Sequence, residues 1–198
     1  MEQVSKSIQS VIDMAWPMVL ISIVVVVSLR ITYLIKNRIH FTLYKELLML
    51  SFIIYTLCLF QIVTFQDDVS WSSNNFVPFR EIFRYQFGSR LFLKNVIGNI
   101  SLFIPFGLFS SYYLKFKKPF IIILLTFIAS FSIETVQMTI GRVFDVDDII
   151  LNVIGGTVGF YIYYFCQKTF SKLPDFFKSE VFLDILSIII LIGVITLI

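Results

Sequence analysis

The side chains of this chain that could do chemistry are amides and carboxylates, and they lie within or beside strongly apolar stretches. Asn95 and Asn99 open one such stretch, and Glu134 and Gln137 stand near the end of the next. The members of each pair are three or four residues apart, so they share one helix face. Amides can hydrogen-bond the phosphate or carbonyl oxygens of a ligand, and a carboxylate can accept or transfer a proton. Because polar groups are costly in hydrocarbon, they usually face a partner or a cavity rather than lipid.

Three acidic residues, Asp145, Asp147 and Asp148, lie at the start of a third apolar stretch, and Asn152 follows four residues after Asp148. Capping and the helix dipole favour acidic side chains at a helix N-terminus, which accounts for at least one of them. Carboxylates can also bind Mg²⁺ or Ca²⁺, but this spacing specifies no metal site. We therefore predict no metal and no other cofactor.

Arg142 is the cation that follows Glu134 most closely along the chain. The two are eight residues apart, too far for a pair along one helix, but they come close if the chain turns at Gly141. Two interpretations stay open: a structural ion pair, and a role for Glu134 as acid, base or hydrogen-bonding group. The single histidine, His40, lies in a basic connector, which argues against a histidine-centred zinc site or triad.

The elements that position these residues must be membrane-spanning helices. Of the 198 residues, 58% are hydrophobic and 15% are charged, and the mean hydropathy is +0.88. A soluble domain would carry more polar surface, and the small net charge of +3 does not indicate nucleic acid. We predict an all-α, polytopic transmembrane helical bundle of about six spans. The apolar runs place these spans near Ala15–Ile35, Leu47–Phe65, Val96–Leu114, Pro119–Ile140, Ile149–Cys166 and Val181–Ile198.

The long connector between the second and third spans has a pattern of its own. Apolar residues recur there at helical spacing from Phe79 to Leu91, while Arg80 and Arg84 occupy the other face. This pattern predicts an amphipathic or re-entrant segment at the level of the lipid headgroups. The chain then divides into two N-terminal spans (1–65), a core of this segment and three spans (66–166), and a connector with a C-terminal span (167–198).

Basic residues gather in alternate connectors, which predicts an orientation. Lys36, Lys117 and Lys172 each represent one such connector, and the positive-inside rule places all three in the cytoplasm. Both termini are then extracytoplasmic, and every polar residue singled out above lies in the outer half of the membrane. Gly155 and Gly159 are expected to let a neighbouring helix come close to the third of these polar spans.

The motifs from about Asn74 to Tyr164 resemble those of the VanZ-like membrane proteins, which are associated with teicoplanin resistance in Gram-positive bacteria. The pieces that carry the resemblance are Asn75-Phe-Val-Pro-Phe79, the run from Asn95 to Gly107, Glu134 with Gln137, and Arg142, Asp145, Asp148, Asn152 and Gly155. The resemblance implies a multi-pass protein of the plasma membrane of a Gram-positive bacterium. It implies no defined reaction, and it leaves the oligomeric state open.

The resemblance and the topology together lead us to expect an outward-facing polar pocket that engages a membrane lipid or a lipid-linked cell-wall precursor. Its expected residues are Asn95, Asn99, Glu134, Gln137, Arg142, Asp145, Asp148, Asn152, Arg80 and Arg84. In this hypothesis arginines meet phosphate charge and amides bind the headgroup. Two alternatives remain. One is a membrane hydrolase or transferase that acts on a lipid-linked substrate through Glu134 and the Asp cluster, with Glu134 and Asp148 as the candidate catalytic residues. The other is a non-catalytic accessory protein in which the polar residues only join helices.

Overall fold

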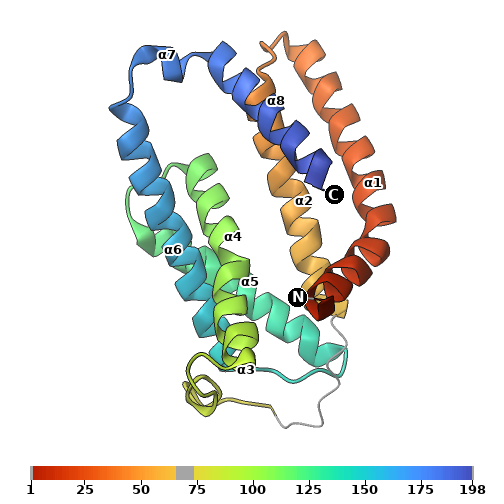
Figure 1. Cartoon of the computed structure of the whole chain (residues 1–198), viewed down its shortest axis with the longest axis vertical. Coiled ribbons are helices and arrows are strands. Elements are labelled where there is room, and N and C mark those ends of the chain that lie inside the picture. Colours follow the sequence, from red (N-terminus) through yellow and green to blue (C-terminus); the bar gives the residue numbers. More distant parts are fainter. Residues whose placement is uncertain (1, 66–73, 198) are drawn as a thin grey trace. The chain divides into compact units, whose positions relative to one another are not determined.

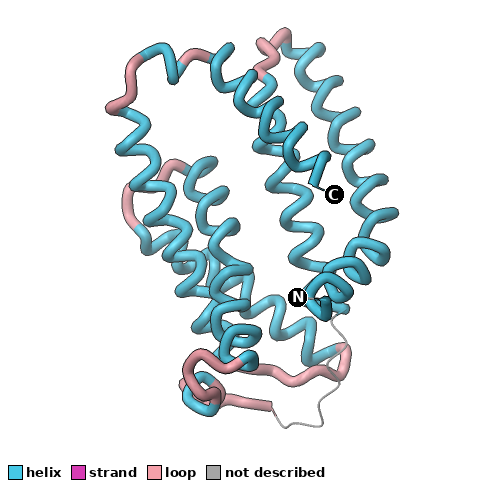
Figure 2. The backbone as a smooth tube through the Cα atoms, viewed as in Figure 1, coloured by secondary structure: helices cyan, strands magenta, loops and turns pink. Residues whose placement is uncertain are grey.

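The computed structural model describes the backbone of residues 2–65 and 74–197, and the side chains of residues 16–60 and 74–192. Figure 2 shows helices joined by loops throughout these ranges. Within them the only extended pairing is an isolated parallel bridge between Asn75 and Asp145. The predicted all-α class is therefore confirmed. Residues 66–73 of the predicted core lie outside the described ranges.

Five helical stretches in the described ranges are long and apolar enough to cross a membrane. They are Trp16–Asn37 of α1 (Glu2–Asn37), Leu43–Phe60 of α2 (Leu43–Phe65), Arg90–Leu114, α5 (Pro119–Thr139) and α6 (Val146–Ser171). The sixth predicted span falls in α8, which runs from Glu180 to Leu197. The chain is thus a multi-pass membrane protein. Pro119 occupies the first turn of α5, where its missing N–H is not needed.

The third span begins earlier than expected and changes its helical form on the way. It consists of α3 (Arg90–Phe92), a π-helical turn (Leu93–Ile97) and α4 (Gly98–Leu114). The apolar run predicted a start near Val96. The polar residues before it are helical too, because Ser89 caps the helix by accepting a hydrogen bond from the Phe92 N–H at 3.1 Å.

The chain forms two compact units, Met1–Cys58 with Lys168–Ile198, and Leu59–Gln167. The first unit holds α1, most of α2, α7 (Asp175–Lys178) and α8. Polar contacts join its helices: Arg30 pairs with Glu46 at 2.8 Å, and Asp184 accepts a hydrogen bond from the Tyr44 N–H at 2.8 Å.

The second unit holds α4, α5 and α6, which are the green, teal and blue helices of Figure 1. Small residues let these helices touch through their backbones. A Cβ at Gly155 would collide with the Ile100 carbonyl group, and one at Gly159 would collide with the Ile104 carbonyl group. The predicted close approach at Gly155 and Gly159 is confirmed, and α4 is the partner helix.

The segment between the second and third spans, which the sequence predicts to be amphipathic or re-entrant, is not one continuous helix. Its helical part before α3 is a single 3₁₀ turn, Ile82–Arg84. Three backbone conformations interrupt the rest: Phe79 and Gly88 are left-handed, with φ of 67° and 76°, and Tyr85 is extended. Phe83 and Phe87 project outward, with 82% and 88% of their surfaces exposed.

Candidate functional site

The segment that starts at Asn74 is joined directly to the beginning of α6. The Asn75 N–H donates to the Phe144 carbonyl at 2.8 Å, and the Val146 N–H donates to the Asn75 carbonyl at 3.0 Å. The Asn74 side chain accepts a further hydrogen bond from the Phe144 N–H at 3.0 Å. These bonds fix the segment 74–89, which we call the outer segment after its predicted side of the membrane, to the junction between α5 and α6.

Asp147 is the strongest anchor of this segment. Its carboxylate accepts hydrogen bonds from the N–H groups of Phe79, Glu81 and Ile82, at 2.5, 2.7 and 3.1 Å. The side chain is only 1% exposed. A buried carboxylate needs such donors, and here they come from a turn whose N–H groups have no helical partners. Asp147 therefore has a structural task, which the sequence did not separate from the tasks of its neighbours.

Asp145 is the N-cap of α6. Its Oδ1 accepts hydrogen bonds from the Asp147 N–H at 2.8 Å and from the Asn75 side chain at 2.8 Å. Burial raises the pKa of Asp145 above the ordinary carboxyl value, although both hydrogen bonds oppose this effect. The interpretation of Asp145 as a cap agrees with this geometry, and the same carboxylate also holds the outer segment.

Glu134 lies buried at the end of α5, where the chain turns back. Its Oε2 accepts a hydrogen bond from the Asp145 N–H at 2.9 Å, and the residue is 2% exposed. The turn is a Schellman motif: the Arg142 N–H donates to the Gln137 carbonyl at 2.9 Å, and Gly141 has a φ of 83°. The expected turn at Gly141 is therefore present, and it brings Arg142 back towards Glu134.

Asp148 lies one residue after the structural carboxylate, and it faces α4. The Asn99 side chain donates a hydrogen bond to its Oδ1. Arg142 is close enough to interact electrostatically with both Asp148 and Glu134. The expected neighbourhood of Asn99, Glu134, Arg142 and Asp148 is thus present, although these residues come from three helices and a turn.

Asn152 lies one helical turn beyond Asp148, in the interior of the unit. Its amide nitrogen donates a hydrogen bond to the Ser130 hydroxyl at 2.9 Å. Its Oδ1 is the one buried side-chain oxygen or nitrogen, among the described side chains, that lacks a hydrogen-bond partner. Gln137 is also buried, at 9% exposure. The Asn152 Oδ1 is therefore an acceptor to which no described donor is assigned.

Asn95 occupies the π-helical turn and hydrogen-bonds the Tyr85 hydroxyl of the outer segment. Partial burial is the main reason that the pKa of Tyr85 is raised. Asn99 lies in α4, just after the π turn, and meets a different partner, the Asp148 carboxylate. Such turns often mark functional positions.

Arg80 and Arg84 are exposed on the outer segment. Arg84 forms an ion pair with Glu81 at 3.1 Å, and its side chain is 70% exposed. The two arginines are thus more exposed than the buried Glu134 and Asn152 and the half-buried Asn99, Arg142 and Asp148, five residues that we call the polar cluster. No set of three or more His, Cys, Asp or Glu residues in the described part of the chain is placed to hold a metal ion.

The family model described as VanZ/LLP1 matches residues 52–167, which is more than half of the chain. The chain belongs to the VanZ/LLP1 family. The match contains the whole outer segment and the polar cluster of this VanZ/LLP1 protein, and it leaves out α1 and α8. Neither the curated proteins nor the solved structures gave a match.

The polar cluster of this VanZ/LLP1 protein is rich in acceptors. Asp148 interacts electrostatically with three other carboxyl groups, those of Glu134, Asp145 and Asp147, and with one guanidinium, that of Arg142. Two of these carboxyl groups are used by backbone N–H donors of the outer segment and of α6. Glu134 also accepts a backbone N–H, that of Asp145, whereas Asp148 accepts from the side chain of Asn99.

Proposed function

We propose that this VanZ-like membrane protein engages the polar headgroup of a lipid-linked envelope molecule, such as a cell-wall precursor, on the extracytoplasmic side of a Gram-positive plasma membrane. The observation that carries the proposal is the polar cluster itself. Glu134, Asp148 and Arg142 lie close together at one end of three spans. The segment that bears the exposed arginines is bonded to the same end. Packing alone would not require such groups inside an apolar unit, because each costs free energy there.

The arrangement suggests a division of labour on the ligand. Arg80, exposed on the outer segment, suits a phosphate at the membrane surface. Glu134, Asp148 and the Asn152 Oδ1 are acceptors, so they suit hydroxyl or amine donors of the headgroup. Arg142 balances part of the carboxylate charge. A change in glycopeptide susceptibility would follow if the bound precursor became less accessible to the drug.

The test is teicoplanin susceptibility of a sensitive Gram-positive host that produces the protein, beside Glu134→Gln at matched levels. Glu180→Gln is the control, because Glu180 is an exposed carboxylate of the other unit, where it pairs with Lys45. We expect the parent and Glu180→Gln to protect the host and Glu134→Gln to fail. Full protection by Glu134→Gln would exclude the cluster from this function.

The enzyme alternative rests on the proximity of Glu134 and Asp148, since two carboxyl groups can share the tasks of acid and base. Asp148→Asn keeps an oxygen that can accept from Asn99 and removes the titrating group. Loss of turnover of a lipid-linked substrate in this variant, with binding retained, would favour a hydrolase or transferase.

The accessory alternative rests on the hydrogen bonds that join helices, such as Asn152 to Ser130. If the cluster only joins helices, Glu134→Gln lowers the melting temperature in detergent, and a lipid-linked cell-wall precursor binds neither form. Binding of the precursor by the parent, and its loss in a Glu134→Gln protein of unchanged melting temperature, would exclude this alternative.

A further inference from the structure

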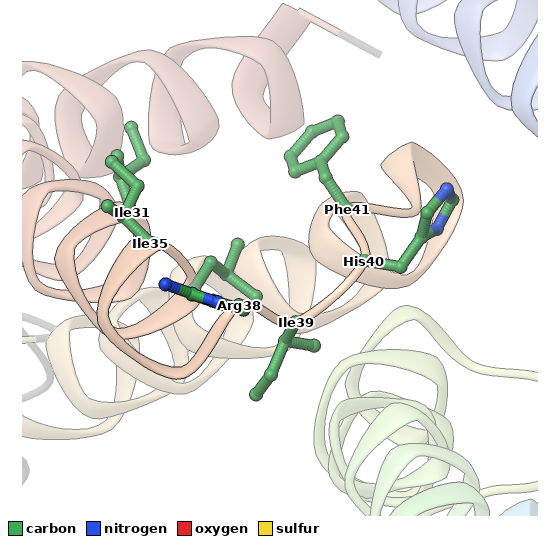
Figure 3. Close-up of a pocket in the computed structure, with 7 residues that line it drawn as sticks. Ile31, Ile35, Arg38, Ile39, His40 and Phe41 are labelled. Carbon is green, nitrogen blue, oxygen red and sulfur yellow. The ribbon is translucent and has the colours of Figure 1, made fainter.

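A groove lies at the corner where α1 ends and the chain turns into α2, in the unit formed by Met1–Cys58 and Lys168–Ile198. Its volume is about 500 Å³. Figure 3 shows its lining, which comes from Ile31, Leu34, Ile35, Arg38, Ile39, His40 and Phe41. Five of these seven side chains are apolar, and the other two are the guanidinium of Arg38 and the imidazole of His40. The groove lies outside the family match and far along the chain from the polar cluster.

The position of the groove relative to the membrane follows from α1. The span Trp16–Asn37 ends one residue before Arg38, so the guanidinium stands where hydrocarbon gives way to headgroups. Ile35 and Ile31 lie about one and two turns earlier in the same helix, and they are 73% and 48% exposed. One groove thus combines an apolar wall at acyl-chain depth with a cation at phosphate depth.

The basic side chains of Lys36 and Arg38 at this corner lack acidic partners among the described residues. The neighbouring acidic groups are already engaged: Glu46 by Arg30, Glu180 by Lys45 and Asp184 by the Tyr44 N–H. Among the side chains of residues 16–60 and 74–192, none forms an ion pair with Arg38 or Lys36. An anion from outside the protein would therefore give Arg38 an ionic partner that no described side chain supplies.

The backbone conformation at Arg38 also supports a role for its side chain. The Arg38 N–H donates to the Ile35 carbonyl at 3.3 Å and the Ile39 N–H donates to the Leu34 carbonyl at 3.1 Å, which is a Schellman motif. Arg38 holds the position usually taken by glycine, with a φ of 51°. The carbonyl groups of Leu34 and Ile35 are already satisfied, so the guanidinium is not needed to cap them. A strained arginine at such a position indicates a task for its side chain.

We propose that this groove binds one anionic phospholipid, with its phosphate on Arg38 and an acyl chain along Ile31 and Ile35, the side toward which the Arg38 guanidinium points (Figure 3). Basic pockets at the cytoplasmic ends of spans recognise anionic headgroups in this way, and the predicted orientation places the corner in the cytoplasmic leaflet. Arginine suits the phosphate because its planar fork donates two parallel hydrogen bonds. The lipid would hold the α1–α2 corner and would not enter the polar cluster.

The test is native mass spectrometry of the purified full-length protein, titrated with phosphatidylglycerol and with phosphatidylcholine of the same chain length. We expect the first phosphatidylglycerol to bind about fivefold or more tightly than phosphatidylcholine, as for one basic residue beside an anionic lipid. Arg38→Gly should abolish this preference. The same variant should melt no lower than the parent, because glycine relaxes the left-handed conformation. Loss of binding then cannot be ascribed to unfolding.

Lys172→Gln is the matched control, since Lys172 is an exposed basic residue of another connector that the charge rule places on the same side. Its lipid preference should equal that of the parent. Equal binding of the two lipids by the parent would overturn the proposal, and so would an equal loss in Lys172→Gln and Arg38→Gly. A two-chain species that excludes lipid would overturn it as well, in favour of a second copy of the chain.

Discussion

Asp147 and Asp148 are adjacent carboxylates in the first turn of α6, yet they do different things. Asp147 is saturated by three backbone N–H groups of the outer segment, whereas Asp148 meets Asn99 of α4 and the electrostatic field of Arg142. Successive residues of a helix point about 100° apart, so neighbours in sequence face different partners. The difference matters for mutagenesis, because a phenotype at Asp147 reports on the fold and one at Asp148 reports on the cluster.

Asp147→Asn should destabilise the protein strongly. The amide offers one oxygen where the carboxylate offers two, and it carries no charge. We expect a loss of about 1.5–3 kcal/mol, the usual range for hydrogen bonds to a charged group. Thermal unfolding in detergent measures it, with Asp175→Asn as the control, because the Asp175 carboxylate is fully exposed and its pairing with Lys178 is at the surface. Equal melting of parent and Asp147→Asn would contradict an anchoring role.

At this scale the sequence predicts the kinds of residue and part of their grouping. Glu134, Arg142 and Asp148 come together as expected, because a glycine permits the turn that reverses the chain after α5. The hydrogen bonds from the N–H groups at Phe79–Ile82 to the Asp147 carboxylate could not be predicted. They join positions far apart in sequence through backbone donors, and backbone donors leave no mark in the residue types.

At the scale of elements, α4, α5 and α6 are held by contact between backbones. A Cβ at Gly107 would meet the backbone of Gly156, and a Cβ at Gly156 would meet the Thr126 side chain of α5. In a membrane, helices gain little from hydrophobic burial against one another, so close packing and hydrogen bonds stabilise their association. The spacing of Gly155 and Gly159 predicts the close approach of α6 to a neighbouring helix at those two positions. The pairing of Gly107 with Gly156 depends on the register between two helices, which spacing within one helix cannot supply.

Gly155→Ala and Gly98→Ala should separate packing from helix propensity. The added methyl at Gly155 collides with the Ile100 backbone, which has no flexible end to move, so α4 must shift. Overpacking of this kind costs about 1–3 kcal/mol. At Gly98 the nearest atom is 3.7 Å from the added carbon, an ordinary contact, and alanine is the better helix former. We expect the melting temperature to fall in Gly155→Ala and not to fall in Gly98→Ala. A similar loss in both would assign the effect to the backbone rather than to packing.

The outer segment shows where periodicity misleads. Apolar residues recur at helical spacing, but Phe79, Tyr85 and Gly88 leave helical geometry and the chain follows its tertiary partners instead. The N–H groups that would form helical hydrogen bonds donate to the Asp147 carboxylate instead. Likewise, the π turn at Asn95 has no signal in composition, because it arises from one residue more than an α-helical turn holds.

At the scale of the whole molecule, hydropathy predicts the class of protein and most of its spans. Length and apolar character suffice for this because a membrane leaves few other structures open to the backbone. The orientation stays a prediction from the distribution of lysine and arginine. It decides whether the polar cluster faces the envelope or the cytoplasm, so it bears directly on the proposed ligand.

Cysteine labelling in cells tests the orientation. In a background without Cys58 and Cys166, Lys117→Cys marks the connector between α4 and α5, and Arg84→Cys marks the exposed outer segment. We expect a membrane-impermeant thiol reagent to label Arg84→Cys in intact cells and Lys117→Cys only after permeabilisation. The reverse pattern would place the polar cluster on the cytoplasmic side and exclude an extracytoplasmic ligand.

The contact between Asp147 and Phe79 also imposes an order on biosynthesis. The two residues are 68 positions apart, and at ~5–20 residues per second a ribosome needs roughly 3 to 14 s to cover that distance. During this interval α4 and α5 are synthesised, while the N–H groups at Phe79, Glu81 and Ile82 still lack their acceptor. The outer segment can therefore dock only when the start of α6 emerges, so a nascent chain arrested before Asp147 would leave it open to proteases.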